Sequence, residues 1–112
     1  MQIYHNPRCS KSRETLALIE KKGIVPEIVL YLEHPPTRKE LKDIITKLGI
    51  SAEQLVRKSE SIYKENYKGK TLSESQWIKA MLEHPKLIER PIVIEGNKAI
   101  IGRPPELVLD IL

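Results

Sequence analysis

The sequence contains only one cysteine, Cys9. A disulfide within the chain is therefore impossible, and any oxidised or substituted sulfur must be resolved by a thiol from another molecule. With one cysteine, no paired metal-ligand spacing and no H-E-x-x-H motif, we expect no metal site. A glycine-rich phosphate-binding loop is also missing. These absences leave Cys9 as the residue whose chemistry has to be explained.

The chain also lacks long hydrophobic runs. No apolar segment approaches the roughly 20 residues that a membrane span needs, so we expect no membrane-embedded segment. Met1 leads directly into Gln-Ile-Tyr-His, without the basic and apolar regions of a secretory signal, and a cytoplasmic, reducing location is the expectation. A length of 112 residues predicts a single domain over residues 1–112.

The charge balance is basic, with 19 Lys and Arg residues against 15 Asp and Glu and a net charge of +4. This excess suits an anionic ligand or an acidic partner. The lysines are scattered without interleaved aromatic residues, which argues against nucleic-acid binding.

The first third of the chain predicts a strand-helix-strand unit. Residues 2–4 form a short apolar strand pattern, and a helix is expected over about residues 10–22, closed by two lysines and Gly23. Residues 28–32 form a continuous apolar run, which is typical of a central strand covered on both faces and parallel to the first. A right-handed crossover would then place the helix on one face of the sheet.

The middle of the chain predicts helices, because three capping boxes occur in it. The boxes are Thr37 to Glu40, Ser51 to Gln54 and Ser73 to Gln76. They predict a helix that ends before Gly49, a short helix ending near Arg57, and a longer helix that carries Trp77. The helical insertion is expected over about residues 37–84, since His84 and Pro85 end the last pattern, as His34 and Pro35 end the strand before it.

The last third predicts a hairpin and a final helix. Gly96 and Asn97 lie between two apolar runs, which is a signal for a tight hairpin turn. Pro104 is expected at the first position of a helix that continues to Leu112. The element order favours an α/β thioredoxin-like fold, with a mixed four-stranded sheet and a helical insertion between the second and third strands. The alternative is another small α/β sandwich.

Cys9 lies at the end of the loop that follows the first predicted strand, directly before the predicted helix. Unpaired N–H groups and the partial positive charge of a helix N-terminus favour a thiolate over a thiol. Arg8 and Lys11 add positive charge nearby. We therefore interpret Cys9 as a nucleophile, against the alternative that it is a buried, unreactive thiol.

Several blocks of sequence resemble one family along nearly the whole chain. The blocks are Tyr4-His5-Asn6-Pro7 with Cys9, Leu30-Tyr31-Leu32-Glu33 with Pro35-Pro36, Leu55-Val56-Arg57-Lys58, Arg90-Pro91-Ile92-Val93, and Gly102-Arg103-Pro104 with Val108-Leu109-Asp110-Ile111. Together they resemble the thioredoxin-fold arsenate reductases that draw electrons from glutathione and glutaredoxin. Many members of that family continue past this last block through a further polar tail.

The resemblance implies that Cys9 attacks arsenate and that three arginines surround the oxyanion. The matching arginines are Arg57, Arg90 and Arg103. Arginine suits this role because its planar fork of donors binds oxyanion oxygens bidentately and stays cationic. Each arginine alone could equally be a solvated surface residue, but all three are predicted at the ends of elements, where sites are commonly assembled. Glutathione is implied as co-substrate and glutaredoxin as partner, with no bound cofactor.

Three further residues are candidates for supporting roles. His5 could tune the thiolate or organise the loop by hydrogen bonds, and Ser12 could offer its hydroxyl to the sulfur or simply cap the helix. The resemblance implies a cis peptide bond before Pro91, whereas base rates for X-Pro bonds favour trans.

Two other functions remain open from the sequence. Redox-sensing transcription regulators of the same fold bind RNA polymerase, but they usually carry a Cys-x-x-Cys switch, and the corresponding segment here is Cys9-Ser10-Lys11-Ser12. A thiol reductase with another substrate would use the same fold and cysteine, because function belongs to the site and not to the scaffold.

Overall fold

The computed structural model describes all residues from Met1 to Leu112. Its elements, in chain order, are β1 (Gln2–Tyr4), α1 (Ser10–Lys21), β2 (Glu27–Val29), α2 (Arg38–Leu48), α3 (Ala52–Leu55), α4 (Ser61–Asn66), α5 (Glu74–Glu83), the 3-10 helix η1 (Pro85–Leu87), β3 (Ile92–Glu95), β4 (Lys98–Ile101) and the 3-10 helix η2 (Pro105–Ile111). None of the helices combines the length and the hydropathy that crossing a membrane requires.

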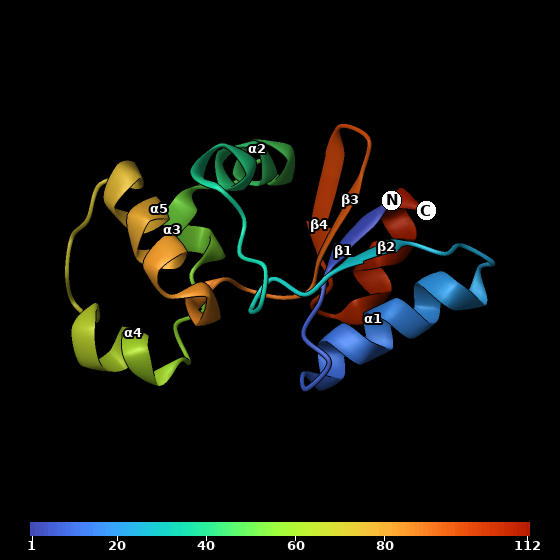
Figure 1. Cartoon of the computed structure of the whole chain (residues 1–112), viewed down its shortest axis with the longest axis horizontal. Helices are drawn as coiled ribbons and strands as arrows, with labels where there is room; N and C mark the ends of the chain where they lie inside the picture. Colours follow the sequence, from blue (N-terminus) through green and yellow to red (C-terminus); the bar gives the residue numbers. More distant parts are fainter. The chain divides into compact units, whose positions relative to one another are not determined.

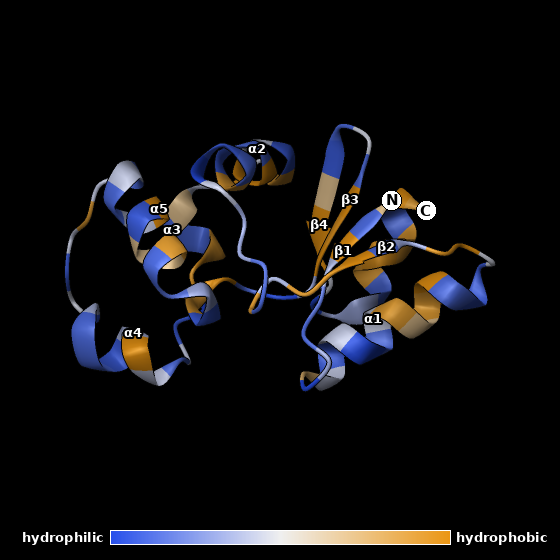
Figure 2. Ribbon diagram, in the orientation of Figure 1, coloured by the Kyte–Doolittle hydropathy of each residue, from blue (hydrophilic) through white to orange (hydrophobic).

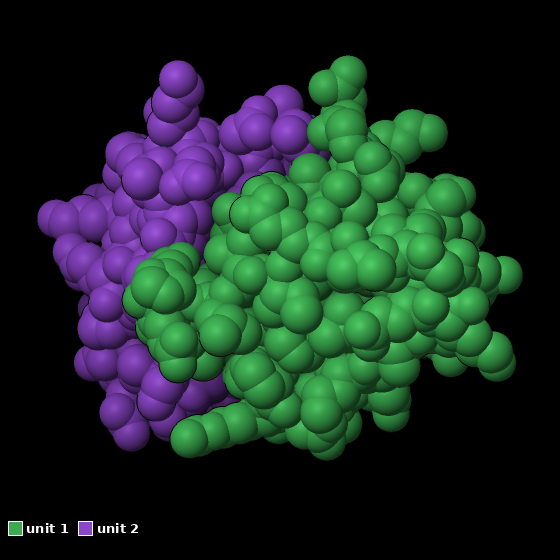
Figure 3. All heavy atoms as spheres, turned by 45° about the vertical axis from the view of Figure 1, so that its right-hand side comes forward, with its two compact units in different colours: residues 1–34, 90–112 green, residues 35–89 purple.

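The chain divides into two compact units (Figure 3). Residues 1–34 and 90–112 form the first, which we call the sheet unit because it contains every strand. Residues 35–89 form the second, the helical unit. The prediction that residues 1–112 make one domain stays a prediction.

The sheet unit is a mixed four-stranded sheet in the order β2-β1-β3-β4, covered by α1 and η2 (Figure 1). β1 pairs with β2 in parallel and with β3 antiparallel, and β3 and β4 form the predicted hairpin, with Glu95 opposite Lys98 around the turn. This arrangement confirms the predicted fold class, including the insertion of helices between the second and third strands.

One row of side chains across the sheet makes the core of this unit. The register aligns Ile3 with Val93 and Val93 with Ile100, so the three side chains point to the same face. Ile3 and Val93 pack there with Ile19 of α1 and Val108 of η2, and all four are fully buried. Figure 2 shows hydrophobic residues concentrated along these strands and alternating with hydrophilic residues along α1. The core therefore holds β1 and α1 against the hairpin and η2.

The predicted second strand is wrong in its extent and its place. The strand ends at Val29, and Leu30 accepts hydrogen bonds from the backbone N–H groups of Glu33 and His34, which turns the chain away from the sheet. β2 is also an edge strand with Ile28 exposed, not a central strand. An apolar run by itself does not distinguish a buried strand from a strand that leads into a turn.

The helical unit follows the predicted caps. The side chains of Thr37, Ser51 and Ser73 each accept a hydrogen bond from the backbone N–H three residues later, and each capping box is complete. Gly49 ends α2 in the left-handed conformation, at φ 69°, which glycine adopts without strain. The sequence did not identify α4, which lacks a side-chain cap.

The final helix differs from its prediction. It is a 3-10 helix that starts at Pro105, one residue later than expected, with Pro104 as the preceding residue. Two consecutive prolines left the starting position ambiguous, because either can occupy the first helical position.

The close approach of α1 to the end of β4 can be tested at Gly102. A Cβ atom at this position would lie 2.5 Å from Oγ1 of Thr15 in α1 and 3.0 Å from Cγ of Pro91. We expect Gly102→Ala to lower the free energy of unfolding by about 1–3 kcal/mol, measured by urea denaturation, because overpacking displaces its neighbours.

A double-mutant cycle with Thr15→Ala is the control for this explanation. Removing the Thr15 side chain removes the nearest clash, so the cost of Gly102→Ala should be smaller in that background. Equal costs in both backgrounds would show that the close contact is not the cause.

Candidate active site

Cys9 occupies the N-cap position of α1 in the sheet unit. Its backbone is extended, at φ −96° and ψ 122°, and its carbonyl accepts the N–H of Arg13 at 3.0 Å. Its own N–H donates to the carbonyl of Asn6 at 3.0 Å. The Cys9 side chain makes no cap hydrogen bond, but the backbone N–H of Ser12 in the first turn of the helix helps to lower the pKa of the thiol. The side chain is partly exposed, which leaves it open to a reactant.

Two arginines from distant parts of the sequence reach the same sulfur. Nη2 of Arg103 lies 3.4 Å from Sγ of Cys9, and the Arg90 side chain donates a hydrogen bond to it. Nε of Arg103 also donates to the backbone carbonyl of Arg90 at 2.7 Å. This bond ties the Arg103 guanidinium to the backbone of Arg90 and so helps to hold it beside Cys9.

The hairpin is what brings these arginines together. Arg90 precedes β3 and Arg103 follows β4, and the antiparallel pairing places these two ends of the hairpin side by side. The N–H of Gly102 donates to the carbonyl of Pro91 at 2.9 Å and continues the ladder to this end. The peptide bond between Arg90 and Pro91 is cis, as the resemblance implied, and the bond between Arg103 and Pro104 is cis as well.

The electrostatic surroundings favour the thiolate. Burial alone raises the pKa of Cys9, but the Ser12 N–H, the Arg90 hydrogen bond and the charges of Arg103 and Arg90 outweigh it and lower that pKa below the ordinary value. Each of these donors stabilises the anion and not the neutral thiol. Cys9 is therefore an activated thiol.

His5 and Ser12 organise the loop before Cys9. Nδ1 of His5 lies 2.6 Å from Oγ of Ser12, and the N–H of Asn6 donates to the same oxygen at 3.1 Å. The Ser12 hydroxyl therefore bonds residues of this loop, and no hydrogen bond joins it to the sulfur or caps α1. Its predicted role in supporting the sulfur stays a prediction. Both side chains are buried, which fixes the geometry of this loop.

His5 does not add charge to this loop at neutral pH. Burial lowers its pKa, the nearby positive charge of Arg13 lowers it further, and Glu20 opposes them weakly. A neutral imidazole can exchange a hydrogen bond with Ser12 but does not stabilise a thiolate by its charge. Of the two roles predicted for His5, the geometry favours the organisation of the loop.

Two other residues in this loop were not identified from the sequence. Oδ1 of Asn6 accepts the N–H of Arg8 at 3.0 Å, and the Arg13 side chain donates to the carbonyl of Pro7 at 2.9 Å. A sequence signal existed for Asn6, since asparagine commonly bonds the backbone two residues on. Arg13 lies four residues after Cys9, but spacing alone does not show which carbonyl its side chain reaches.

Arg57 belongs to the helical unit and is described there. Its Nη1 lies 3.0 Å from Oε1 of Glu89, and its Nε lies 3.9 Å from Oε2 of Glu60. The three side chains are each about one-quarter exposed or less, at 22–23%. The backbone N–H of Arg57 donates to the carbonyl of Leu87 at 2.7 Å. Its predicted role in binding the oxyanion stays a prediction.

Metal ligands do not gather in this structure: no group of three or more His, Cys, Asp or Glu side chains is placed to hold a metal ion. The fold and the site together define a thioredoxin-like protein with a cysteine activated by a helix N-terminus and two arginines.

Comparison with known proteins agrees with this class. The ArsC family model matches residues 4–111, and the chain belongs to the ArsC family. An arsenate reductase from Haemophilus influenzae is 56% identical over 112 residues, which cover 98% of this chain and 97% of that protein. The uncharacterized protein YfgD of Escherichia coli K12 is 54% identical over 114 residues, covering 100% and 96%. The solved structure of an arsenate reductase from Vibrio cholerae matches with a TM-score of 0.95 at 52% identity, covering 100% of this chain and 98% of that one.

The activated thiol generates a pH prediction. Because the folded protein lowers the pKa of Cys9, the rate of alkylation by iodoacetamide should reach half its maximum below about 8.5, the ordinary value for cysteine. Arg103→Gln removes one positive charge beside the sulfur, so its midpoint should move to higher pH. Lys22→Gln, which removes a charge at the other end of α1, should leave the midpoint unchanged. A wild-type midpoint at the ordinary value would contradict the activation.

Proposed function

We propose that this chain is an arsenate reductase that uses glutathione and glutaredoxin as electron donors. The observation that carries the proposal is the contact of one sulfur with Arg90 and Arg103. A nucleophile between two guanidinium groups suits an anionic electrophile, because the arginines both stabilise the thiolate and attract the oxyanion that it attacks. The similarity to proteins named arsenate reductases supports arsenate as that oxyanion.

The first step of the proposed reaction forms a bond between sulfur and arsenic. The Cys9 thiolate attacks arsenic(V), and one arsenate oxygen takes up protons and leaves as water. Arg90 and Arg103 would hold the remaining oxygens and offset their negative charge. The glutathione thiol then displaces a second oxygen, which also leaves as water, so arsenic carries two sulfur substituents and is still pentavalent.

The reduction takes place in the next step. A glutaredoxin thiolate attacks the glutathione sulfur, and the bond between that sulfur and arsenic breaks with its electron pair left on arsenic. Arsenic becomes trivalent, and the two thiols become a mixed disulfide. Hydrolysis then releases arsenite and restores the Cys9 thiolate. Both electrons come from outside this chain, which agrees with its having only one cysteine.

The single cysteine also weighs against the regulatory alternative. A disulfide switch within one chain requires a second thiol, and this chain has none. A reductase that acts on another oxyanion or on a thiol adduct would use the same site, and the assay that follows separates it from an arsenate reductase.

The central test is arsenate-dependent NADPH oxidation in the presence of glutathione, glutathione reductase and glutaredoxin. The wild type should be active, and Cys9→Ser should fall to background because a serine hydroxyl does not ionise near neutral pH. Full activity in Cys9→Ser would refute the mechanism. An inactive wild type whose Cys9 is still rapidly alkylated would indicate another substrate.

The predicted role of Arg57 has its own test. Arg57→Lys keeps the positive charge but removes the planar fork, so the KM for arsenate should rise about tenfold while the KM for glutathione stays the same. Arg38→Lys makes the same change in an exposed arginine of the helical unit that bonds Ser75, and it should alter neither constant. An unchanged KM for arsenate in Arg57→Lys would remove this residue from the oxyanion site.

A further inference from the structure

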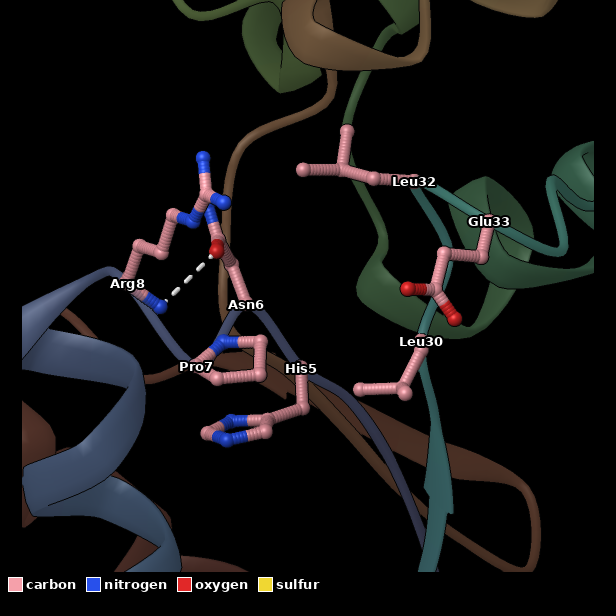
Figure 4. A pocket seen from close by; sticks show the side chains of 7 residues that line it. All are labelled: His5, Asn6, Pro7, Arg8, Leu30, Leu32 and Glu33. Atoms are coloured by element: carbon pink, nitrogen blue, oxygen red, sulfur yellow. Dashed lines mark hydrogen bonds between the residues drawn. The ribbon is translucent and has the colours of Figure 1, made fainter.

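A cleft of about 270 Å³ opens beside the cysteine loop within the sheet unit (Figure 4). One wall is the loop between β1 and α1, and the other is the segment that follows β2. The residues that line it include Asn6, Pro7 and Arg8 on the first wall and Leu30, Leu32 and Glu33 on the second. The volume is near the lower end of the range for small-molecule sites, so the cleft fits a small ligand and not a folded protein.

The two walls carry opposite charges that have no partner within the protein. Arg8 stands on the loop side and Glu33 on the opposite side, and both side chains are exposed. Neither takes part in an ion pair. A ligand that carries both a carboxylate and an ammonium group could therefore pair with both walls at once.

Asn6 adds a fixed donor to the loop wall. The side chain is only 8% exposed, and its Oδ1 accepts the N–H of Arg8 at 3.0 Å. Its Nδ2 makes no hydrogen bond within the protein, and it is not one of the fully buried side-chain atoms that lack a partner, so it keeps access to the cleft that Asn6 lines. An accessible amide N–H on a side chain that is otherwise held in place is suited to an acceptor on a ligand.

The apolar residues of the two walls and the position of the cleft restrict the ligand further. Leu30, Leu32 and Pro7 offer apolar surface for the methylene groups of a short peptide. Residues 5–8, which line the cleft, lead directly into Cys9, although Cys9 itself does not line it. An extended tripeptide spans roughly 10 Å, so a peptide in the cleft extends toward the nucleophile. A simple oxyanion such as arsenate has no cationic group for Glu33 and would be repelled by it.

We propose that this cleft is the subsite for the thiol co-substrate, a short peptide thiol with both carboxylate and ammonium groups, of which glutathione is the example. This inference rests on the proposed function, because that function requires an external thiol beside Cys9. Arg8 pairs with a carboxylate, Glu33 pairs with the ammonium group, and Asn6 donates to a backbone carbonyl or carboxylate of the peptide.

The first experiment measures binding without any reaction. S-methylglutathione, which cannot exchange with Cys9, is titrated into the full-length protein and followed by amide chemical shifts in NMR spectra. Shifts should concentrate on residues 6–8 and 30–33. Arg8→Gln and Glu33→Gln should each weaken binding by at least about fivefold, since each loses a charged hydrogen bond. Lys22→Gln and Glu106→Gln, which change exposed charges elsewhere in the sheet unit, should bind like the wild type.

The second experiment measures the same variants in the coupled assay. Arg8→Gln and Glu33→Gln should raise the KM for glutathione by a similar factor and leave the KM for arsenate unchanged. The expectation that the charge of Arg8 favours the thiolate is not met, since Arg8 is not among the groups that lower the pKa of Cys9. The alkylation midpoint of Cys9 should therefore stay the same in Arg8→Gln, which separates loss of a binding contact from a change in the thiol.

The outcomes of these experiments keep the two proposals apart. An active wild type that shows no S-methylglutathione shifts at the cleft, or variants with an unchanged KM for glutathione, would overturn the subsite while the arsenate reductase function stands. Binding at the cleft in a protein that does not reduce arsenate would overturn the proposed function and support a peptide-thiol site.

Discussion

The stabilisation of one thiolate is the interaction on which the rest of the site depends. Burial opposes ionisation of Cys9, and the protein compensates with the Ser12 N–H at the start of α1 and with the positive groups of Arg90 and Arg103. A helix N-terminus offers donors that need no side chain, so the polar loop before it is free for other contacts. The activity of such a thiol therefore depends on how accurately α1 and the hairpin are held together.

The sheet unit supplies that accuracy through packing. The row of Ile3, Val93 and Ile100 fixes β1 and the hairpin in register, and Ile19 and Val108 hold α1 and η2 against them. At the site itself Gly102 allows the end of β4 to approach Thr15, because any side chain there would collide with α1. The close approach places Arg103 beside the sulfur. The fully buried core, with its single register of the strands, therefore sets how close Arg103 lies to the partly exposed sulfur of Cys9.

Local signals predicted the helices well and the strands less well. The capping boxes that start at Thr37, Ser51 and Ser73 are satisfied within four residues, so their outcome does not depend on distant parts of the chain. The extent of β2 was predicted wrongly, because the bonds to the Leu30 carbonyl and the edge position arise from the way the chain turns and pairs. The hairpin turn at Gly96 and Asn97 was predicted correctly, since a two-residue loop between apolar runs is itself a local signal.

The sequence by itself determined which residue is the candidate nucleophile, because there is only one cysteine and it stands before a strong helix pattern. It also indicated the fold class and, through resemblance, the arginines to consider. Only the tertiary structure decided that Arg90 and Arg103 meet at Cys9, that the Ser12 hydroxyl bonds His5, and that Arg8 and Glu33 line one cleft. The physical reason is that some of these contacts join residues up to 94 positions apart, and others depend on the direction in which a side chain points. The pattern of residue types along the chain contains neither kind of information.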